Sequence, residues 1–341
     1  MGREFDLYLI TGATGFLGKV IVNRLLEKGK RVRALVLPND PATGDLPKGV
    51  ELVCDRVDDR TSLAEFFKGD LKEACLIHGA GIISIATRKN PKLRAVNVEG
   101  TKNIMEMCLE HGVAKVVHIS SVHAIPEKPR GQIMREIRNF SEKTVIGSYA
   151  KSKAAGTNAV FSAIERGLNA CIVHPSGIIG PYDTGSGNVT STVISFCKKK
   201  LPIAVKGGYD FVDVRDVADG IISCSENGEK GECYILSGQY AKLSDILGYL
   251  SRIGCGREPM YLPLWLVKCI APFLEWHCVL HKKPLFLTPY SAYTLGSNAY
   301  FSHEKATAAW GYKPRSLFET LDDMVHWLAK NRMIPHREEK K

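Results

Sequence analysis

The feature that most constrains the fold is a glycine-rich turn near the start of the chain. Residues 11–18, Thr-Gly-Ala-Thr-Gly-Phe-Leu-Gly, follow a short aliphatic and aromatic run at 7–10 and open a segment with helical spacing. In this setting Gly12 permits a tight turn, Gly15 lets backbone N–H groups approach a pyrophosphate, and Gly18 allows the helix to pack closely on the strand. The turn therefore predicts a dinucleotide-binding strand–helix unit.

Beyond this turn, short β-branched or aliphatic runs alternate with longer segments of helical spacing. Such alternation predicts parallel strands joined by crossover helices on both faces of one sheet. The predicted strands are residues 7–10, 32–37, 50–54, 74–78, 116–120 and 170–174, and the predicted helices are 18–28, 61–68, 96–111 and 149–166. The predicted fold class is α/β, a Rossmann doubly wound parallel sheet.

The regular alternation ends near residue 175, and the chain beyond it is richer in glycine, proline and aromatic residues. We expect residues 1–175 to form the main part of the NAD(P)-binding Rossmann domain. Residues 176–335 should form a mixed region, mostly a smaller substrate-binding cap, with some segments that return to the Rossmann domain. Such a cap would cover the carboxyl edge of the sheet, where open α/β sheets bind ligands.

Composition and charge argue against several classes of protein. No apolar run approaches the roughly 20 residues of a membrane-spanning helix, and the N-terminus lacks the layout of a signal peptide, so we expect a cytoplasmic protein without a membrane span. The net charge of +10 is spread along the chain, which argues against a nucleic-acid partner. The ten cysteines form no C-x-x-C pair and mostly lie in apolar runs, so we expect buried thiols and no metal site.

The choice between NAD(H) and NADP(H) stays open. NAD enzymes usually carry an acid at the end of the second strand, where it accepts from the ribose 2′-hydroxyl. Here that strand ends without a carboxylate at the expected step, which leans mildly toward NADP(H). Arg33 or Lys19 could then meet the extra phosphate, whereas Asp40 could still reach a hydroxyl.

A tyrosine and a lysine four residues apart form a candidate proton-transfer pair. In a helix, Tyr149 and Lys153 would face one side within about one turn. A free phenol titrates at about 10, and a neighbouring ammonium favours the phenolate. The spacing alone is common on solvated helix faces. Ser121 supports the pair, because it follows a predicted strand at the same sheet edge as the glycine turn and could hydrogen-bond a substrate oxygen.

Together these segments resemble the extended short-chain dehydrogenase/reductase superfamily (the NAD-dependent epimerase/dehydratase family), in particular its dihydroflavonol-reductase-like and 3β-hydroxysteroid-dehydrogenase-like branch. The T-G-x-x-G-x-x-G loop is similar to residues 11–18, the Y-x-x-x-K motif to residues 149–153, and the catalytic serine to Ser121. The resemblance covers nearly the whole chain, including the cap. Further similar segments are residues 78–81, 96–101, 174–181, 210–217 and 308–315.

The resemblance implies hydride transfer between nicotinamide and a carbonyl or carbinol carbon. Tyr149 would give or take the proton, Ser121 would orient the oxygen, and Lys153 would hold the ribose hydroxyls and lower the pKa of Tyr149. Asn97 would support a proton relay through water. Asp55 would lie near the adenine, and Pro175 to Ile178 near the carboxamide. The implied cofactor contacts are Gly12, Thr14, Gly15, Phe16, Leu17, Gly18, Asp55, Ala80, Tyr149, Lys153, Pro175 and Ile178.

A late apolar segment, residues 260–276 followed by 284–287, indicates the kind of substrate. Between its prolines the first part has room for a short helix that is apolar around nearly its whole circumference, so it must be buried, face a ligand or touch a membrane. The resemblance places this segment where the cap closes over the nicotinamide. We therefore predict a hydrophobic small-molecule substrate, such as a steroid or flavonoid-like ketone, with burial in the cap core as the alternative.

Three other functions stay open. A nucleotide-sugar epimerase or dehydratase with tightly bound NAD shares the fold, but such enzymes usually follow the sixth strand with an Arg-x-x-Asn-x-Tyr-Gly-Pro-like segment, where this chain has His-Pro-Ser-Gly at 174–177. A dinucleotide sensor would typically lose the Tyr–Lys pair. A peripheral membrane protein would use the apolar cap and the basic end at 336–341, whose own two acids weigh against it.

The resemblance also implies a possible homodimer through the 149–166 helix.

Overall fold

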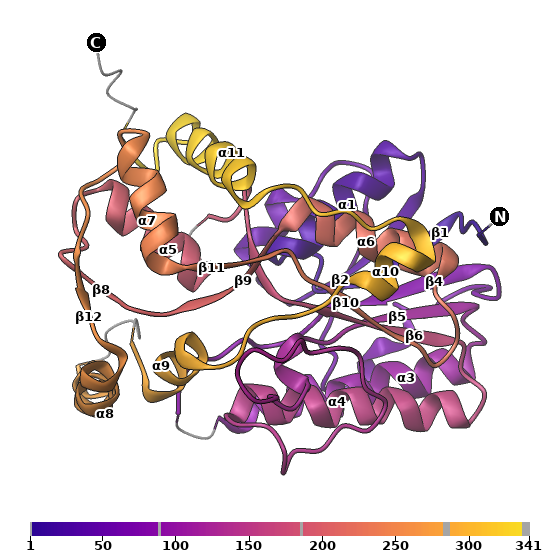
Figure 1. Cartoon of the computed structure of the whole chain (residues 1–341). Helices are drawn as coiled ribbons and strands as arrows, with labels where there is room; N and C mark the ends of the chain where they lie inside the picture. Colours follow the sequence, from indigo (N-terminus) through magenta and orange to yellow (C-terminus); the bar gives the residue numbers. More distant parts are fainter. Residues whose placement is uncertain (1, 88–89, 185–186, 282–286, 336–341) are drawn as a thin grey trace.

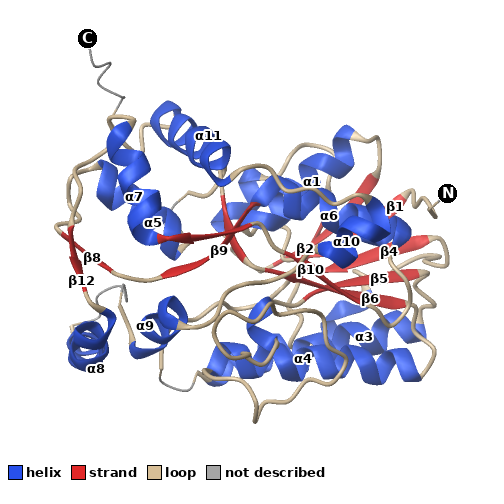
Figure 2. Ribbon diagram, in the orientation of Figure 1, coloured by secondary structure: helices blue, strands red, loops and turns tan. Residues whose placement is uncertain are grey.

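A seven-stranded, entirely parallel sheet forms the centre of the protein, with helices on both of its faces (Figures 1 and 2). The computed structural model describes residues 2–87, 90–184, 187–281 and 287–335. Parts of three predicted segments therefore lie outside the described residues: 185–186 of the predicted cap region, 284–286 of the apolar segment, and the basic end at 336–341. The doubly wound parallel sheet predicted from the sequence is confirmed.

The strands of this sheet have the order β10-β6-β5-β4-β1-β2-β3, so the chain starts in the middle and winds outward in both directions. The point where the order reverses lies beside β1, which is where the glycine turn emerges. The strands are β1 (Leu7–Thr11), β2 (Arg31–Val36), β3 (Glu51–Cys54), β4 (Ala74–His78), β5 (Lys115–Ile119), β6 (Ala170–Pro175) and β10 (Cys233–Leu236).

The strands are apolar on both sides because each face of the sheet packs against helices. On β1, Tyr8 and Ile10 point into the core beneath one helical layer, whereas Leu9 points into the core beneath the other. Strands buried on both faces appear in the sequence as nearly unbroken apolar runs, which is the pattern that predicted them. The first layer is α1 (Phe16–Glu27), α6 (Val214–Asn227) and α10 (Glu304–Trp310), and the second is α3 (Thr101–Glu110) and α4 (Ser148–Glu165).

The cap lies beyond the carboxyl ends of the strands and has two small sheets of its own (Figure 2). In the first, β9 pairs parallel with β7 and antiparallel with β11; in the second, β8 pairs parallel with β12. These strands are β7 (Gly177–Ile179), β8 (Ile203–Val205), β9 (Gly208–Asp213), β11 (Gln239–Lys242) and β12 (Met260–Leu262). The surrounding helices are α5 (Asn188–Cys197), α7 (Leu243–Arg252), α8 (Leu264–Leu280), α9 (Pro289–Gly296) and α11 (Leu317–Lys330).

Two predicted helices differ from the observed elements. The helix predicted over 61–68 is wrong: the chain forms only a short 3-10 turn, η2 (Arg60–Ala64), whose N-cap Asp59 accepts from the Thr61 backbone. The apolar residues Leu63, Phe66 and Phe67 that suggested a helix are buried in the core all the same. The helix predicted over 96–111 begins earlier and has three parts, α2 (Pro91–Arg94), the π-helical turn η3 (Ala95–Gly100) and α3. Two further 3-10 turns are η1 (Pro41–Asp45) and η4 (Val122–Ala124).

The helix predicted between the prolines at 263 and 272 is longer than expected. It is α8, which continues through Pro272 to Leu280. Proline removes one helical hydrogen bond and crowds the carbonyl four residues earlier, but Pro272 lies on the exposed side of α8, where water can satisfy that carbonyl. None of the helices in the described ranges is both long enough and apolar enough to cross a bilayer.

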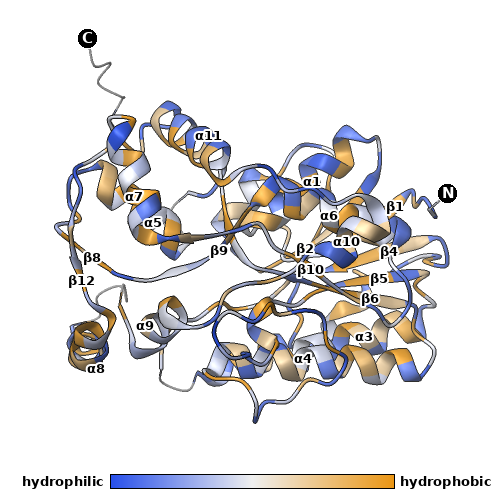
Figure 3. Cartoon of the chain, viewed as in Figure 1, coloured by the Kyte–Doolittle hydropathy of each residue, from blue (hydrophilic) through white to orange (hydrophobic). Residues whose placement is uncertain are grey.

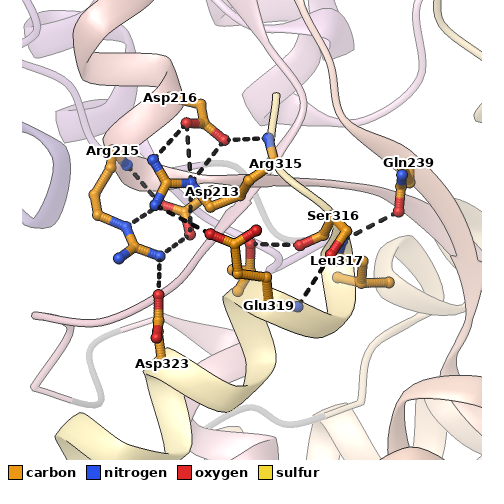
Figure 4. Close-up of polar contacts among 10 residues, drawn as sticks. Asp213, Arg215, Asp216, Gln239, Arg315, Ser316, Leu317, Glu319 and Asp323 are labelled. Atoms are coloured by element: carbon orange, nitrogen blue, oxygen red, sulfur yellow. Dashed lines mark hydrogen bonds and ion pairs between the residues drawn. The ribbon is translucent and has the colours of Figure 1, made fainter. Parts of the chain in front are cut away.

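A charged network joins the cap to the helical layer over the large sheet (Figure 4). Asp213, at the end of β9, accepts from the Arg215 backbone and binds the Arg215 guanidinium with both carboxylate oxygens, at 2.9 and 2.7 Å. The same guanidinium pairs with Asp323 of α11 at 2.7 Å. On the neighbouring turn, the Arg315 guanidinium lies 2.8 Å from Asp216. The network fixes the start of α6 and the start of α11 relative to β9.

We predict that Asp213→Ala lowers the free energy of unfolding by about 3 kcal/mol, because it removes both the cap of α6 and a buried partner of Arg215. Chemical denaturation of the purified protein measures this value. Glu319→Ala is the matched control in the same network: its side chain is 56% exposed and 3.9 Å from Arg315, so its loss should cost no more than about 1 kcal/mol. Equal effects of the two substitutions would show that the network contributes little.

Candidate active site

A cavity of about 1250 Å³ lies between the carboxyl ends of the parallel strands and the cap. Of the site residues predicted from the sequence, all but Asn97 line this cavity. They are Gly12, Thr14, Gly15, Phe16, Leu17, Gly18, Asp55, Ala80, Ser121, Tyr149, Lys153, Pro175 and Ile178. Positions up to 166 residues apart in the chain thus meet at one edge of the sheet, since the carboxyl ends of parallel strands share that edge.

The glycine turn at one end of the cavity depends on very close backbone contacts. Gly12 has φ of +77°, and a Cβ there would lie 2.7 Å from the carbonyl carbon of Gly79. A Cβ on Gly18 would overlap the carbonyl oxygen of Gly12. Gly15 is the N-cap of α1, whose first turn contains no acidic residue. The N–H groups of that turn have no helical partners, so they form a site for a phosphate-sized anion.

The residues considered for the adenosine end are mostly occupied by other contacts. Arg33 is buried, donates to the carbonyls of Phe66 and Lys68, and pairs with Glu51. Lys19 pairs with Asp45, and the Asp40 carboxylate accepts from the Ala42 backbone within its own turn. Arg33 is therefore not free to meet an additional phosphate.

Two residues at the ends of β2 and β3 do line the cavity at this position. Asp55 lies just beyond β3, and its carboxylate accepts from the Arg56 backbone at 2.9 Å. Leu37, just beyond β2, is 55% exposed. The exposed apolar side chain stands where an NAD enzyme of this fold usually has its acid, and it selects neither coenzyme.

Tyr149, Lys153 and Ser121 meet on the wall of the cavity. Tyr149 and Lys153 lie one turn apart at the start of α4, and both are buried. The Ser121 hydroxyl, just beyond β5, lies beside the Tyr149 phenol and accepts from the His123 backbone at 3.2 Å. The Lys153 ammonium donates to the carbonyl of Ile119 at 2.9 Å, so two of its three protons are left for other acceptors.

Burial sets the protonation of this group. It raises the pKa of Tyr149 to about 12, with the Ser121 hydrogen bond acting in the opposite direction. It also lowers the pKa of Lys153 to about 8. Desolvation of the phenolate is the dominant effect on the pKa of Tyr149, and the lowering by Lys153 stays a prediction. At neutral pH the phenol is protonated and the lysine is mostly charged.

Asn97 lies behind the cavity wall and connects its parts. Its Oδ1 accepts from the Ile82 backbone at 2.7 Å, and its Nδ2 donates to the Ile82 carbonyl and to the Ser152 hydroxyl, each at 3.0 Å. Ser152 in turn donates to the carbonyl of Tyr149 at 2.8 Å. Asn97 therefore positions the loop after β4 against the start of α4. Its role in a proton relay stays a prediction.

The loop after β4 is also fixed from the side of β1. The Ala80 backbone donates to the Thr11 hydroxyl at 3.1 Å, and that hydroxyl lies 2.7 Å from Nδ1 of His78. The other nitrogen of His78 lies 3.0 Å from the Thr101 hydroxyl. Burial lowers the pKa of His78 to about 3, so the ring is neutral and links the two hydroxyls.

At the other end of the cavity, Pro175 and Ile178 mark the passage of the chain from one sheet to the next. Pro175 is the last residue of β6 in the large sheet, and Ile178 pairs with Val212 in the small one. Asp210 of β9 lies close to this turn and is buried, which raises its pKa to about 6. Its carboxylate accepts from the Gly238 backbone at 2.9 Å.

Sequence reasoning missed three aromatic residues beside Tyr149. His123 is half-buried with its ring 5.6 Å from that of Tyr149, and its two nitrogens each lie 3.1 Å from a phenol oxygen, Nε2 from Tyr209 and Nδ1 from Tyr290. All three line the cavity. His123 stands two residues after Ser121, which was a local signal, but nothing in the sequence indicated that Tyr209 and Tyr290 would join it.

Comparison with known families gives one model that covers most of the chain. The model of the NAD dependent epimerase/dehydratase family matches residues 8–237. That range contains the glycine turn, Ser121, Tyr149 and Lys153. It also includes β7, β8 and β9 of the cap and ends just after β10. The match therefore covers both the large sheet and part of the cap.

Individual relatives match over nearly the full chain. The chain is 31% identical to a putative dihydroflavonol 4-reductase of Synechocystis, over 96% of this chain and 95% of the relative. It is 30% identical to sterol demethylase protein B of Methylococcus capsulatus, over 96% and 99%. Among solved structures it is similar to gox2253, with a TM-score of 0.83 and 31% identity over 96% of this chain and 99% of that one.

We predict that Gly15→Val weakens dinucleotide binding about 10- to 100-fold, the loss expected when a charge-assisted hydrogen bond to a phosphate is blocked. A Cβ at Gly15 would lie 3.3 Å from the Gly12 oxygen, so the backbone can keep its shape while the branched side chain covers the first-turn amides. Titration of NADH and NADPH by fluorescence measures the affinity.

Gly44→Val is the control, because a Cβ there meets nothing within 4 Å. Thermal unfolding of both variants shows whether the fold is retained. An unchanged affinity in a folded Gly15→Val protein would place the dinucleotide elsewhere.

Proposed function

Because this chain belongs to the NAD-dependent epimerase/dehydratase family, we propose that it is an NAD(P)-dependent reductase or dehydrogenase acting on the carbonyl or secondary alcohol of a hydrophobic substrate. The observation that carries the proposal is the placement of Ser121, Tyr149 and Lys153 together on the wall of a cavity whose two ends differ in chemistry. One end is the glycine turn with its anion site. The other is the apolar wall of the cap.

The residues of the first end fit a dinucleotide. The glycine turn leaves room for a pyrophosphate at the start of α1, and Asp55 and Ala80 border the path from there to Lys153. Lys153 would hold the ribose hydroxyls with its two free protons. Pro175 and Ile178 would lie beside the carboxamide. A bound nicotinamide would supply or accept the hydride at the substrate carbon.

Tyr149 would transfer the proton at the substrate oxygen. In reduction it would donate the phenolic proton to the oxygen that gains charge as the carbonyl carbon accepts a hydride, and in oxidation it would take that proton back. Its high pKa makes the protonated phenol the resting form at neutral pH, which suits the reductive direction. Ser121 would hold the same oxygen. The charged Lys153 nearby would stabilise the phenolate left after donation.

The lining of the cap supports an apolar substrate. Aliphatic side chains are the largest group among the cap residues on the cavity wall: Val189, Leu201, Ile203, Val205, Leu262, Val267, Leu287 and Leu295. Asn188, Thr190, Thr192, Ser195 and Thr294 add uncharged polar groups. Of the described cap residues that line the cavity, Lys200 is the single lysine or arginine. A nucleotide sugar brings a diphosphate, which favours several cations. The epimerase or dehydratase that the family membership leaves possible is therefore our second candidate.

We predict that Tyr149→Phe lowers kcat by about 10²- to 10⁴-fold, the usual effect of removing a general acid, while cofactor affinity is kept. The ring and its packing remain, and only the hydroxyl is lost. Steady-state oxidation of the reduced cofactor with a carbonyl substrate measures kcat. Tyr300→Phe, at an exposed site outside the cavity lining, is the control and should keep full activity. Near-normal turnover by Tyr149→Phe would remove it from the proton-transfer role.

We predict that KM falls as the apolar area of the substrate rises, because each buried CH₂ contributes about 0.8 kcal/mol. A panel of ketones and secondary alcohols of increasing hydrophobic size, assayed beside UDP-glucose and UDP-galactose, tests this. No trend with apolar area, together with turnover of a nucleotide sugar, would favour the epimerase. NAD that stays bound through purification, identified by mass spectrometry, would point the same way.

A further inference from the structure

The outer side of α8 exposes several large aromatic side chains to solvent. Trp265, Phe273 and Trp276 are 67%, 74% and 66% exposed, and Leu280 is 60% exposed. Spacings of three, four, seven and eight residues place these side chains, with Cys269, on one face of the helix. Figure 3 shows α8 as a largely apolar helix at the edge of the molecule, away from the large sheet.

The opposite side of α8 is packed against the protein. Val267 and Ala271 are fully buried, and Val267 lines the cavity. Glu275 is 9% exposed and accepts from the Thr87 backbone at 2.8 Å. The packing of α8 on the protein therefore uses the side with Val267, Ala271 and Glu275, and the aromatic side chains take no part in it.

The charges on α8 are of one sign wherever they reach solvent. Glu275 is the one acidic residue of Leu264–Leu280, and it is buried. The exposed Lys268 and His277 flank the aromatic stripe on its two sides, and Lys282 and Lys283 follow directly in the sequence. An aromatic stripe bordered by basic residues, with no exposed acid, matches the acyl–headgroup boundary of an anionic bilayer.

We propose that α8 docks the protein onto the surface of an anionic lipid bilayer. The helix has 17 residues and is too short to cross one, so it would lie along the surface with Trp265, Phe273, Trp276 and Leu280 in the interface. A second copy of the chain fits less well. A two-fold contact through this face would bring the basic borders together with no exposed acid of α8 to neutralise them.

The position of α8 beside the cavity connects the proposed membrane docking with entry of the substrate. Ile83 lines the cavity and is 75% exposed, so it marks an opening to solvent. The same loop is bonded to α8 itself, through Thr87 to Glu275, and to the start of α9, through the Ile85 carbonyl, which accepts from Thr288 at 2.7 Å. Under the proposed function an apolar substrate would enter here from the lipid. The docking itself does not rest on that function.

The test is co-sedimentation of the full chain with vesicles of phosphatidylcholine, alone or mixed with phosphatidylglycerol. We expect binding to the mixed vesicles that weakens in high salt, and at least about a tenfold loss of binding for Trp265→Ser/Trp276→Ser, since interfacial binding scales with buried apolar area. The control is Ile133→Ser/Phe318→Ser, which removes two apolar side chains exposed elsewhere, at 50% and 45%. It should bind as the unmodified protein does.

Tryptophan fluorescence provides a second readout. Trp310 and Trp327 are partly buried, so the exposed Trp265 and Trp276 should account for a blue shift on addition of anionic vesicles. Lys268→Glu should reduce binding to the mixed vesicles and leave the fold intact.

Three results would overturn the proposal. The first is no binding to either vesicle, and the second is equal binding by the Trp265→Ser/Trp276→Ser variant and the control, which would mean only attraction by the net positive charge. The third is a dimer in sedimentation velocity that dissociates in the tryptophan variant, since a second copy would then cover this face. Activity on water-soluble ketones reports on the proposed function separately, and we expect it to survive in every α8 variant.

Discussion

The site depends on the close approach of three backbone segments at the carboxyl edge of the sheet. Gly12, in a left-handed conformation, lies against Gly79, and Gly18 lies against the Gly12 carbonyl. A Cβ at either position would clash with the backbone. Because both residues are glycine, α1 can start directly beyond β1 and place its first-turn amides at the cavity. The loop after β4, held by Thr11 and Asn97, closes the other side. A displacement at Gly12 would separate the anion site from Tyr149 and Lys153, because both are positioned from this edge.

The cap is assembled from segments that are distant in sequence, and its polar contacts hold it in a fixed relation to the sheet. Asp213 ends β9 of the small sheet and begins α6 of the large-sheet layer, so one residue belongs to both parts. Arg215 extends that connection to α11 through Asp323. Aliphatic side chains are the largest group among the cap residues that line the cavity. The ion-paired Asp213, Arg215, Arg315 and Asp323 are not part of that lining (Figure 4). This division explains how an apolar chamber can form beside an anion site.

The parts predicted from the sequence are those with short-range signals. The strand–turn–helix pattern predicted the sheet, and the four-residue spacing of Tyr149 and Lys153 predicted a pair that the fold does place on one helix and one cavity wall. Properties that depend on burial or distant partners could not be predicted. The raised pKa of Tyr149 follows from desolvation by the cap, and the partners of His123 lie 86 and 167 residues away. The continuation of α8 through Pro272 depended on which side of the helix faces water.

The polar groups around Tyr149 share a property that bears on what the cavity can accept. Burial lowers the pKa of His123 to about 4 and raises the pKa values of Tyr209 and Tyr290, so all three are uncharged at neutral pH. A neutral imidazole has one N–H and one lone pair. It can therefore accept a hydrogen bond from one phenol and donate one to the other, and the hydroxyl hydrogen of that second phenol stays available to another acceptor. The wall next to Tyr149 can thus donate hydrogen bonds without presenting a charge. A neutral carbonyl oxygen matches such a wall, whereas a fixed anion placed there would be buried without a counter-ion from these residues.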